Sequence, residues 1–354
     1  MMSIRLRLGA AIVAGALALV GFTAVGAEAC ACGAMVPPKG SSVDVDAERA
    51  LVKLDSGVET IALQLNMLGG STEAALVVPT PAPARVSAGD TDMFTRLDEL
   101  TEPEVRVVND WWPSIGGDGA TAVGSAPTVV RQVQLGPLEA TTLKGGTTKS
   151  LKKWLSAHHY VLSPAVRDGL ADYVRRGWSF VAVRLKSHRD LNGGTPPLLI
   201  KFPSKTLVYP MRLSRAATEP QHVRMYVVGQ HKMTRADSDN SGSAAGSSSV
   251  EWAGRIASAD LDNAGLKEFF GTNDYLTVFS SVYTDPRLQI SSDYRFVRAG
   301  DDDPYQPVQT RHHSVQVGGI YAGPLIAVAV AVLVLAGIIT LVVRVLRRRK
   351  TSTL

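Results

Sequence analysis

The hexapeptide Thr60-Ile61-Ala62-Leu63-Gln64-Leu65 places large apolar side chains at every second position. Successive side chains of a β-strand point to opposite faces of a sheet, so this pattern predicts a strand with one face in the core. Working outward from it, short apolar runs predict further strands: Val43–Leu54, Ala74–Val78, Val129–Leu135, Phe180–Lys186, Leu198–Phe202, Val223–Val228, Tyr275–Tyr283 and Leu288–Val297. We expect the last two to form a hairpin that turns at Asp285-Pro286.

Helical spacing is found in four stretches. The first has Met93, Leu97 and Leu100 after a cap at Asp90 or Thr91, and the second has Leu151, Trp154, Leu155 and His158. The third has Val166, Leu170, Tyr173 and Val174; it starts at Ser163-Pro164 and stops at Gly177. The fourth covers residues 262–270 and stops at Gly271. Helices and strands do not alternate regularly. The sequence therefore predicts an α+β fold with a mainly antiparallel sheet and a few packed helices.

A Ser-, Gly- and Ala-rich run at residues 237–249 interrupts this pattern. Such a composition is typical of a flexible loop or an interdomain linker. It divides the predicted ectodomain into a main part (30–233), the linker or loop (234–250) and a smaller α+β segment (251–297). The following residues, 298–321, show no period and include Asp301-Asp302-Asp303-Pro304, so we expect a solvated stalk.

The N-terminus has the features of a secretory signal peptide over residues 1–29. Arg5 and Arg7 precede an apolar core, and Ala27-Glu28-Ala29 supplies small residues for cleavage. Cleavage after Ala31 is an alternative, as is an uncleaved N-terminal anchor; a lipoprotein signal at Cys30 fits less well.

A stronger membrane signal lies near the other end of the chain. Residues 322–343 carry no charge, and a helix of that length spans about 33 Å, enough to cross a hydrocarbon core of about 30 Å. The basic residues after it mark 344–354 as a cytoplasmic tail by the positive-inside rule. We therefore expect a single-pass cell-membrane protein with its ectodomain outside and its C-terminus in the cytoplasm.

The net charge of +5 comes from the membrane flanks. Arg5, Arg7, Arg344 and the run 347–350 contribute seven basic residues, and without these and Glu28 the chain has 30 basic and 31 acidic residues. A basic stripe for nucleic acid is therefore not indicated, and we expect no nucleic-acid partner.

Six segments occur in an order that resembles a known family: Cys30-Ala31-Cys32-Gly33, Glu48–Val52, Leu76–Pro83, Leu138–Leu143, Gly177–Ala182 and Leu207–Arg212. This set resembles the uncharacterised bacterial envelope family known as domain of unknown function 2330, over roughly residues 30–230. The resemblance implies a secreted or membrane-anchored protein. It supplies no catalytic residues.

Cys30 and Cys32 are the only cysteines in the sequence. Outside the membrane a disulfide is permitted, so they form a candidate disulfide, although the loop between them is very small. Pairing between chains is an alternative, whereas catalysis or metal binding has less support.

Local motifs for metals, cofactors or nucleophiles are incomplete. No H-E-x-x-H spacing occurs, His158 fits a hydrogen-bonded core residue, and adjacent His312 and His313 would point opposite ways in an extended chain. Asp237–Gly242 copies half of a calcium loop, but Ser248 stands where a bidentate Glu is needed. Gly177-Trp178-Ser179 begins like a nucleophile elbow, but Val181 stands where the closing glycine is needed. We expect no catalytic, metal or cofactor residues.

Trp111 and Trp112 are the candidate partner contacts. Both precede a Gly-rich run, 116–127, that is expected to be a long surface loop. One ring could anchor the loop on the core while the other meets a glycan or protein; alternatively, both anchor the loop. We expect a binding or scaffolding module at the bacterial cell envelope, with an envelope protein or glycan as ligand. The alternative is a hydrolase-type envelope enzyme whose site is assembled only in the fold, and a third is a stalk protein without a ligand.

Overall fold

The predicted strand at residues 60–65 is the middle of a long hairpin formed by β3 (Val43–Asp55) and β4 (Val58–Gly69). Ser56 and Gly57 both have positive φ and make a two-residue turn, the connection that suits the twist of paired strands. The structure is a computed structural model that describes residues 28–30, 33–113, 139–143, 148–240 and 247–351. The predicted strand at residues 129–135 lies outside these residues.

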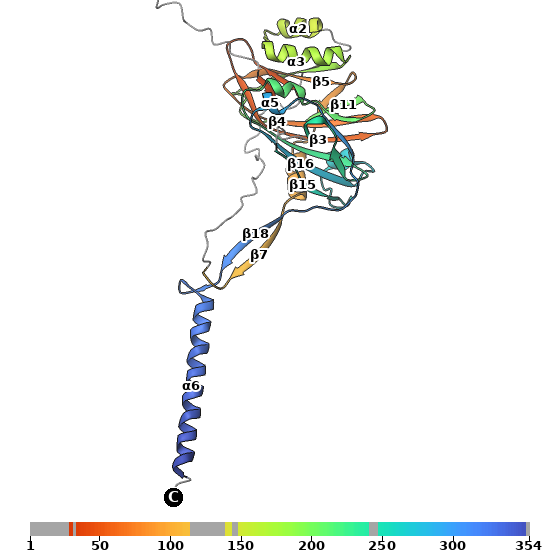
Figure 1. The fold of residues 1–354 in the computed structure, drawn as a ribbon. Helices are drawn as coiled ribbons and strands as arrows, with labels where there is room; N and C mark the ends of the chain where they lie inside the picture. The colour runs from red at the N-terminus through yellow and green to blue at the C-terminus, as the bar shows by residue number, and fades with distance from the viewer. Residues whose placement is uncertain (1–27, 31–32, 114–138, 144–147, 241–246, 352–354) are drawn as a thin grey trace, which may run out of the picture.

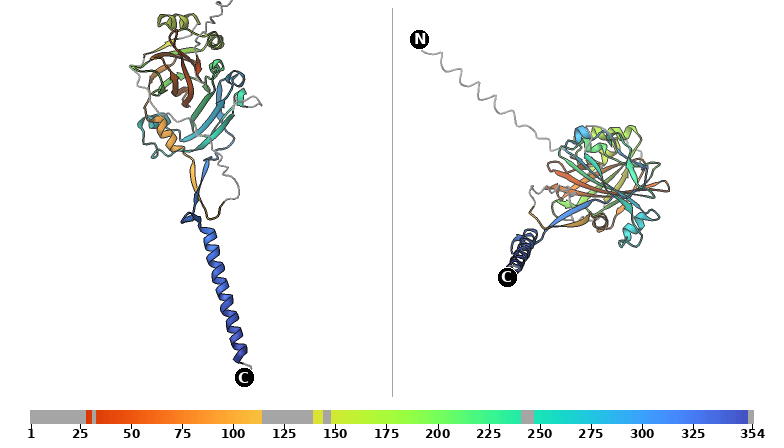
Figure 2. Two further views of the ribbon diagram at one scale, coloured as in Figure 1. Left: turned by 90° about the vertical axis from the view of Figure 1, so that its left-hand side faces the viewer. Right: turned by 60° about the horizontal axis from the view of Figure 1, so that its bottom comes forward.

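Two large sheets face each other within the described part of the chain (Figures 1 and 2). The larger contains, in order, β15 (Ser247–Arg255), β16 (Tyr275–Tyr283), β13 (Gln221–Gly229), β3, β4, β11 (Leu198–Pro203) and β6 (Arg85–Ala88), with β10 (Gly193–Gly194) paired to β4. The smaller contains β1 (Glu28–Cys30), β2 (Gly33–Val36), β5 (Glu73–Thr80), β9 (Ser179–Lys186) and β8 (Glu139–Leu143). Every pairing in the two sheets is antiparallel except β13 with β3, so the predicted α+β class with mainly antiparallel sheet is confirmed.

Helices cover the outer face of each sheet. α2 (Thr148–Ala157) and α3 (Pro164–Arg175) pack on the smaller sheet, and α1 (Met93–Leu100) and α4 (Ala264–Phe270) pack on the larger sheet. All four match the predicted helices. At α3 the Ser163 hydroxyl accepts the Val166 N–H, and Gly177 follows the helix with φ +74°. At α1 the N-cap is Asp92 instead of Asp90 or Thr91.

Three hydrophobic layers result from this arrangement. In β5, Leu76 and Val78 face the core between the two sheets, whereas Ala75 and Val77 face α2 and α3. Strands of this kind are buried on both faces, which explains why several of them are continuous apolar runs without strict alternation. On the far side, Asp98 of α1 accepts hydrogen bonds from Arg49, Arg224 and Tyr226, which fixes this helix to the larger sheet.

A third, small sheet consists of β12 (Leu207–Tyr209), β17 (Tyr294–Arg298) and β14 (Met233–Arg235). The predicted strand at 288–297, paired as a hairpin with β16, is wrong at its start and in its partner. Residues 286–289 form the helical turn α5 (Pro286–Gln289), because the Asp285 carboxylate accepts the Leu288 N–H and Pro286 favours the first helical position. β17 pairs with β12 and β14.

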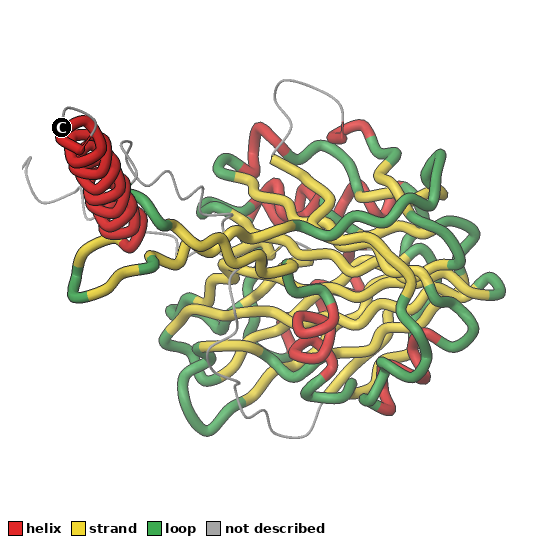
Figure 3. Tube along the Cα trace, turned by 90° about the horizontal axis from the view of Figure 1, so that it is seen from below, coloured by secondary structure: helices red, strands yellow, loops and turns green. Residues whose placement is uncertain are grey.

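The expected linker, 234–250, includes ordered structure at both ends. The end of β14, the 3-10 turn η2 (Ser238–Asn240) and the start of β15 fall within it, and residues 241–246 lie outside the described residues. β16, from the predicted smaller segment, lies between β15 and β13, so strands of both predicted units share one sheet. Figure 3 shows the strands of the sheets side by side, with the long helix at the marked C-terminus apart from them.

The predicted stalk contains a narrow two-stranded ribbon. β18 (Val308–Ser314) pairs in parallel with β7 (Glu104–Asp110), and a small hairpin, β19 (Gln316–Val317) with β20 (Ile320–Tyr321), leads directly into α6 (Ala322–Thr351). Figure 2 shows this ribbon as a neck between the sheets and α6. The part of α6 from Ala322 to Leu346 is long and apolar enough to cross a membrane, and none of the residues in its most apolar stretch is buried in the protein. The predicted signal peptide lies outside the described residues except for Glu28 and Ala29, which belong to β1.

Candidate functional site

A groove of about 540 Å³ opens between α3, the 3-10 turn η1 (Arg212–Ala216) and α5. α3 and α5 lie at the end of the two-sheet domain far from α6 (Figure 1). The lining residues from α3 are Ala165, Asp168, Gly169 and Asp172; those from η1 are Arg212, Leu213, Arg215 and Ala216; and those from α5 and the segment after it are Arg287, Leu288 and Ser291.

The groove has one acidic wall and one basic wall. Both carboxylates, Asp168 and Asp172, come from α3, whereas the three guanidinium groups come from η1 and α5. A glycine in α3 allows the two walls to lie close together. A Cβ atom on Gly169 would lie 2.9 Å from Cδ2 of Leu213, so the glycine allows η1 to pack closely on α3.

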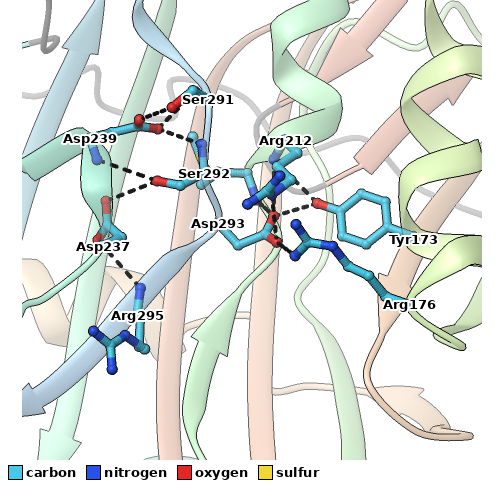
Figure 4. Close-up of polar contacts among 10 residues, drawn as sticks. Tyr173, Arg176, Arg212, Asp237, Asp239, Ser291, Ser292, Asp293 and Arg295 are labelled. Atoms are coloured by element: carbon cyan, nitrogen blue, oxygen red, sulfur yellow. Dashed lines mark hydrogen bonds and ion pairs between the residues drawn. The ribbon is translucent and has the colours of Figure 1, made fainter.

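Asp293, which immediately precedes β17, organises the basic wall (Figure 4). Its side chain is only 6% exposed. Oδ1 accepts the backbone N–H groups of Met211 and Arg212, both at 3.1 Å, and thereby caps the start of η1. Oδ2 accepts from Nε of Arg212 at 3.2 Å and lies 3.5 Å from Nη1 of Arg176. One buried carboxylate thus holds two arginines and fixes the Arg212 side chain in the wall.

Tyr173 of α3 completes this cluster. Its hydroxyl donates to Oδ1 of Asp293 and accepts the Arg212 N–H at 3.2 Å. Burial, together with the neighbouring Asp293 carboxylate, raises the pKa of the Tyr173 phenol well above its ordinary value. The phenol therefore keeps its proton and remains a donor to Asp293 at any physiological pH.

A second carboxylate, Asp239, holds the segment that carries Ser291 (Figure 4). Asp239 accepts the backbone N–H groups of Ser291 at 2.8 Å and Ser292 at 2.7 Å, and the Ser291 hydroxyl also donates to it. Partial burial acts to raise the pKa of Asp239, but these hydrogen bonds outweigh it and lower the pKa below its ordinary value. Nearby, Asp237 forms a buried ion pair with Arg235. Both acids of the incomplete calcium loop are therefore engaged by protein donors.

Arg215 and Arg287 differ from Arg212. Both side chains are exposed at the groove, and neither has an ion-pair partner among the described residues. On the opposite wall, Asp172 pairs with Arg175. The groove therefore presents two available guanidinium groups beside a third that is held in place. Guanidinium groups bind carboxylate and phosphate oxygens through paired N–H donors, so this arrangement can bind an oxyanion.

Another cavity, of about 500 Å³, lies beside the β3–β4 turn. Two of its polar lining residues are already bonded within the protein: His231 to Asp302 at 2.7 Å, and Arg295 to the Ala236 carbonyl at 2.7 Å. Its lining also includes two exposed cationic residues, Lys205 and Arg298. The groove between α3 and α5 is the better candidate binding site because buried Asp293 holds one of its arginines in place beside the two available ones.

The residues singled out from the sequence do not line this groove. Trp111 and Trp112 are both exposed and lie beside the first turn of α6, so neither ring anchors a loop on the core. Cys30 lies at the end of β1, whereas Cys32 and the predicted loop at 116–127 lie outside the described residues. His158, which follows α2, donates a hydrogen bond from Nδ1 to the Trp154 carbonyl oxygen at 2.9 Å. Within the described ranges, no group of three or more His, Cys, Asp or Glu side chains is placed to hold a metal ion.

The comparisons with known proteins identify a family. The model of the family described as uncharacterized protein conserved in bacteria, domain of unknown function 2330, matches residues 26–297. The chain belongs to this family. The match contains the whole groove and extends the predicted resemblance beyond residue 230, while the β18 strand and α6 lie outside it.

No curated protein matches the chain. Among solved structures, baculovirus P35 is similar with a TM-score of 0.35 at 12% identity, over 73% of this chain and 92% of that chain. A mutated baculovirus P35 after caspase cleavage gives a TM-score of 0.33 at 11% identity, over 72% of this chain and 100% of that chain. At these scores neither likeness bears on what this member of the family does.

Sequence reasoning missed the groove because its parts are far apart in the chain. Asp293 fell within a predicted strand, and Arg287 within the predicted hairpin. One signal did point to it: the family-like segment Leu207–Arg212 ends on Arg212, which lines the groove. A charged residue that closes an otherwise apolar segment is a reasonable candidate for a buried partner such as Asp293.

Proposed function

We propose that this protein is a membrane-tethered binding module whose ectodomain captures a carboxylate-bearing ligand outside the cell membrane. The observation that carries the proposal is the pair of available arginines, Arg215 and Arg287, beside Arg212, which Asp293 holds in a fixed position. The envelope ligand predicted from the sequence, a protein or a glycan, is the source of the carboxylate.

The charge of the groove favours a single oxyanion over a dense polyanion. Three arginines line it, but so do Asp168 and Asp172, which would repel closely spaced negative groups. A carboxylate matches the planar guanidinium fork, and each such charged hydrogen bond contributes about 1.5–3 kcal/mol. Because buried Asp293 has already ordered Arg212, binding does not have to restrict that side chain.

The tether is α6. Its apolar stretch and the basic residues that follow support a membrane span with the ectodomain outside and the C-terminus in the cytoplasm. The groove would then face away from the bilayer. The Ala331→Arg variant is expected to lose membrane retention, since a central charge costs about 3 kcal/mol on insertion scales. Retention is measured by fractionation of cells.

Sidedness is tested by labelling whole cells with an impermeant thiol reagent, after Cys30 and Cys32 are replaced by Ser. A cysteine at exposed Thr284 should be labelled, whereas one at Ser352 should react only after lysis. Labelling of the Ser352 position alone in whole cells would contradict the proposed orientation.

Binding is tested with the full chain in detergent and two probes that each carry a single carboxylate, galacturonic acid and a short peptide amide with one glutamate residue. Together the probes distinguish a glycan source of the carboxylate from a protein source. We expect the Arg215→Gln, Arg287→Gln double variant to bind the preferred probe at least tenfold more weakly, which corresponds to about 1.4 kcal/mol. The matched control is Arg85→Gln with Arg189→Gln, which removes the same charge from exposed positions outside the groove. Equal weakening in both double variants would show that net charge, and not the groove, binds the probe.

A further inference from the structure

The strand β7 ends in contact with the start of α6. The Trp111 carbonyl oxygen accepts the Gly323 N–H at 2.8 Å, and the Val315 carbonyl oxygen accepts the Ala322 N–H at 2.9 Å. Val315 in turn donates its N–H to the Asp110 carbonyl oxygen at 3.0 Å. Trp111 is therefore fixed to the first turn of the helix by a backbone hydrogen bond, although more than 200 residues separate the two in the sequence.

The Trp112 ring packs directly against this turn. A Cβ atom on Gly323 would lie 2.7 Å from Cε2 of Trp112 and 2.5 Å from the Trp111 carbonyl oxygen. Any residue larger than glycine at position 323 would therefore push Trp112 and the end of β7 away from α6. Gly337, farther along the same helix, has nothing within 4 Å of a Cβ.

Both rings remain largely exposed despite this contact, at 46% for Trp111 and 58% for Trp112. Val317 and Ile320 of the β19–β20 hairpin are exposed at the same end of the neck, and Tyr321 immediately precedes α6. Aromatic and aliphatic side chains thus surround the point where the helix begins.

The level of these side chains relative to a bilayer follows from the length of α6. Its uncharged residues, 322–343, span about 33 Å of helix and end at Arg344, whereas a hydrocarbon core is about 30 Å thick. The first turn of the helix therefore lies in the interfacial layer when the stretch is inserted. Tryptophan and tyrosine favour that layer because their rings are apolar and their N–H or O–H groups can be hydrated.

We infer that Trp111 and Trp112 insert into the headgroup layer of the bilayer that α6 crosses, and that they fix the neck of the ectodomain to the membrane surface. This inference rests on the proposed membrane tether, and its occupant is lipid. A protein partner at the same two rings is the alternative outcome of the test. The continuity of the rings with the inserted helix favours lipid, because a protein partner would have to bind at the bilayer surface itself.

The experiment uses the full chain in phosphatidylcholine vesicles, which carry no net charge and so do not engage the basic groove. Lipids brominated on the acyl chain near the headgroup quench tryptophans that touch them. Two of the five tryptophans in the sequence are at the neck. We expect brominated lipid to quench part of the emission of the wild type and of the control variant Trp178→Phe, and to lose this effect in the Trp111→Phe, Trp112→Phe variant.

Vesicle flotation separates the two proposals. If the chain floats with vesicles but its emission is quenched by aqueous iodide and not by brominated lipid, the tether stands and the insertion of the tryptophans is refuted. If the chain does not float, both are refuted.

A glycine pair tests the contact between Trp112 and α6. Gly323→Ala should keep flotation unchanged, shift tryptophan emission to longer wavelength and reduce quenching by brominated lipid. Gly337→Ala should match the wild type in all three measurements. If brominated lipid quenches Gly323→Ala as strongly as the wild type, the proposed contact between Trp112 and the helix is refuted.

Discussion

Replacing Glu59 with Gln should stabilise the protein in alkaline solution and leave its stability nearly unchanged in acid. Glu59 lies in β4 and is fully buried; its carboxyl group accepts the Val208 N–H at 3.3 Å and thereby ties β4 to β12. Burial raises the pKa of this carboxyl from 4.5 to about 8, and the hydrogen bonds that it accepts offset only part of that effect. Glu59 is therefore protonated and neutral in the folded protein at neutral pH.

The sign and size of the effect follow from linkage. Between pH 4.5 and 8 the folded state binds a proton that the unfolded state has lost, so the free energy of unfolding falls as pH rises through this window. A difference of between three and four pKa units, at about 1.4 kcal/mol per unit, corresponds to a loss on the order of 5 kcal/mol by pH 8. Glutamine has the shape of the protonated acid and does not ionise, so Glu59→Gln should remove this loss.

The assay is urea unfolding of the full chain in detergent, followed by near-ultraviolet circular dichroism at pH values from 5 to 9. The control is Glu268→Gln, whose side chain is 81% exposed and which should retain the pH dependence of the wild type. If the wild type is equally stable at pH 5 and pH 9, or if Glu59→Gln is the less stable protein at pH 9, the reasoning from burial is refuted.

Two further predictions concern the carboxylates in Figure 4. Asp293→Ala should cost about 3–5 kcal/mol in urea unfolding, because it leaves Arg176 and Arg212 without their shared counter-charge, whereas Asp168→Ala, at an exposed position, should change stability by less than about 0.5 kcal/mol; similar losses in the two variants would contradict the central role of Asp293. Because hydrogen bonds lower the pKa of Asp239, its carboxylate stabilises the fold above the ordinary value of 3.8, and this stability is lost as the pH falls through the lower folded value. Asp239→Asn should therefore cost on the order of 1 kcal/mol at neutral pH and flatten the acid limb of the stability curve below about pH 4, and an unchanged acid limb would refute this.

Most of the secondary structure was predictable because it follows from local sequence patterns. Ser163-Pro164 and Gly177 marked both ends of α3, and the alternation at residues 60–65 identified the centre of β4. The hairpin proposed at Asp285-Pro286 failed because the same two residues also favour the start of a helical turn. The local sequence is compatible with both the hairpin and the helical turn. The helical turn forms because β17 pairs with β12 and β14 and not with β16.

The candidate site was largely unpredictable from sequence for a physical reason. Asp293, Arg212 and Tyr173 come from three separate segments, and each is unremarkable among its neighbours. The contact between Trp112 and Gly323 likewise depends on the parallel pairing of β7 with β18, which no local sequence pattern predicts. Membrane segments are the opposite case, because length and apolarity alone define them and α6 could be read directly from residues 322–343.

The parallel ribbon of β7 and β18 also has a mechanical consequence. A single extended strand can rotate about its backbone bonds, whereas a ribbon held to the two-sheet domain through both strands resists twisting. Its upper end is secured where Tyr305 and Ala253 exchange backbone hydrogen bonds of 2.7 Å and where Glu104 donates to Pro307. Seven residues per strand, at about 3.3 Å each, make the ribbon a spacer of roughly 23 Å. With α6 in a bilayer, the two-sheet domain would be held at a fixed height and in a fixed orientation, and a ligand would reach the groove at a set distance from the membrane surface.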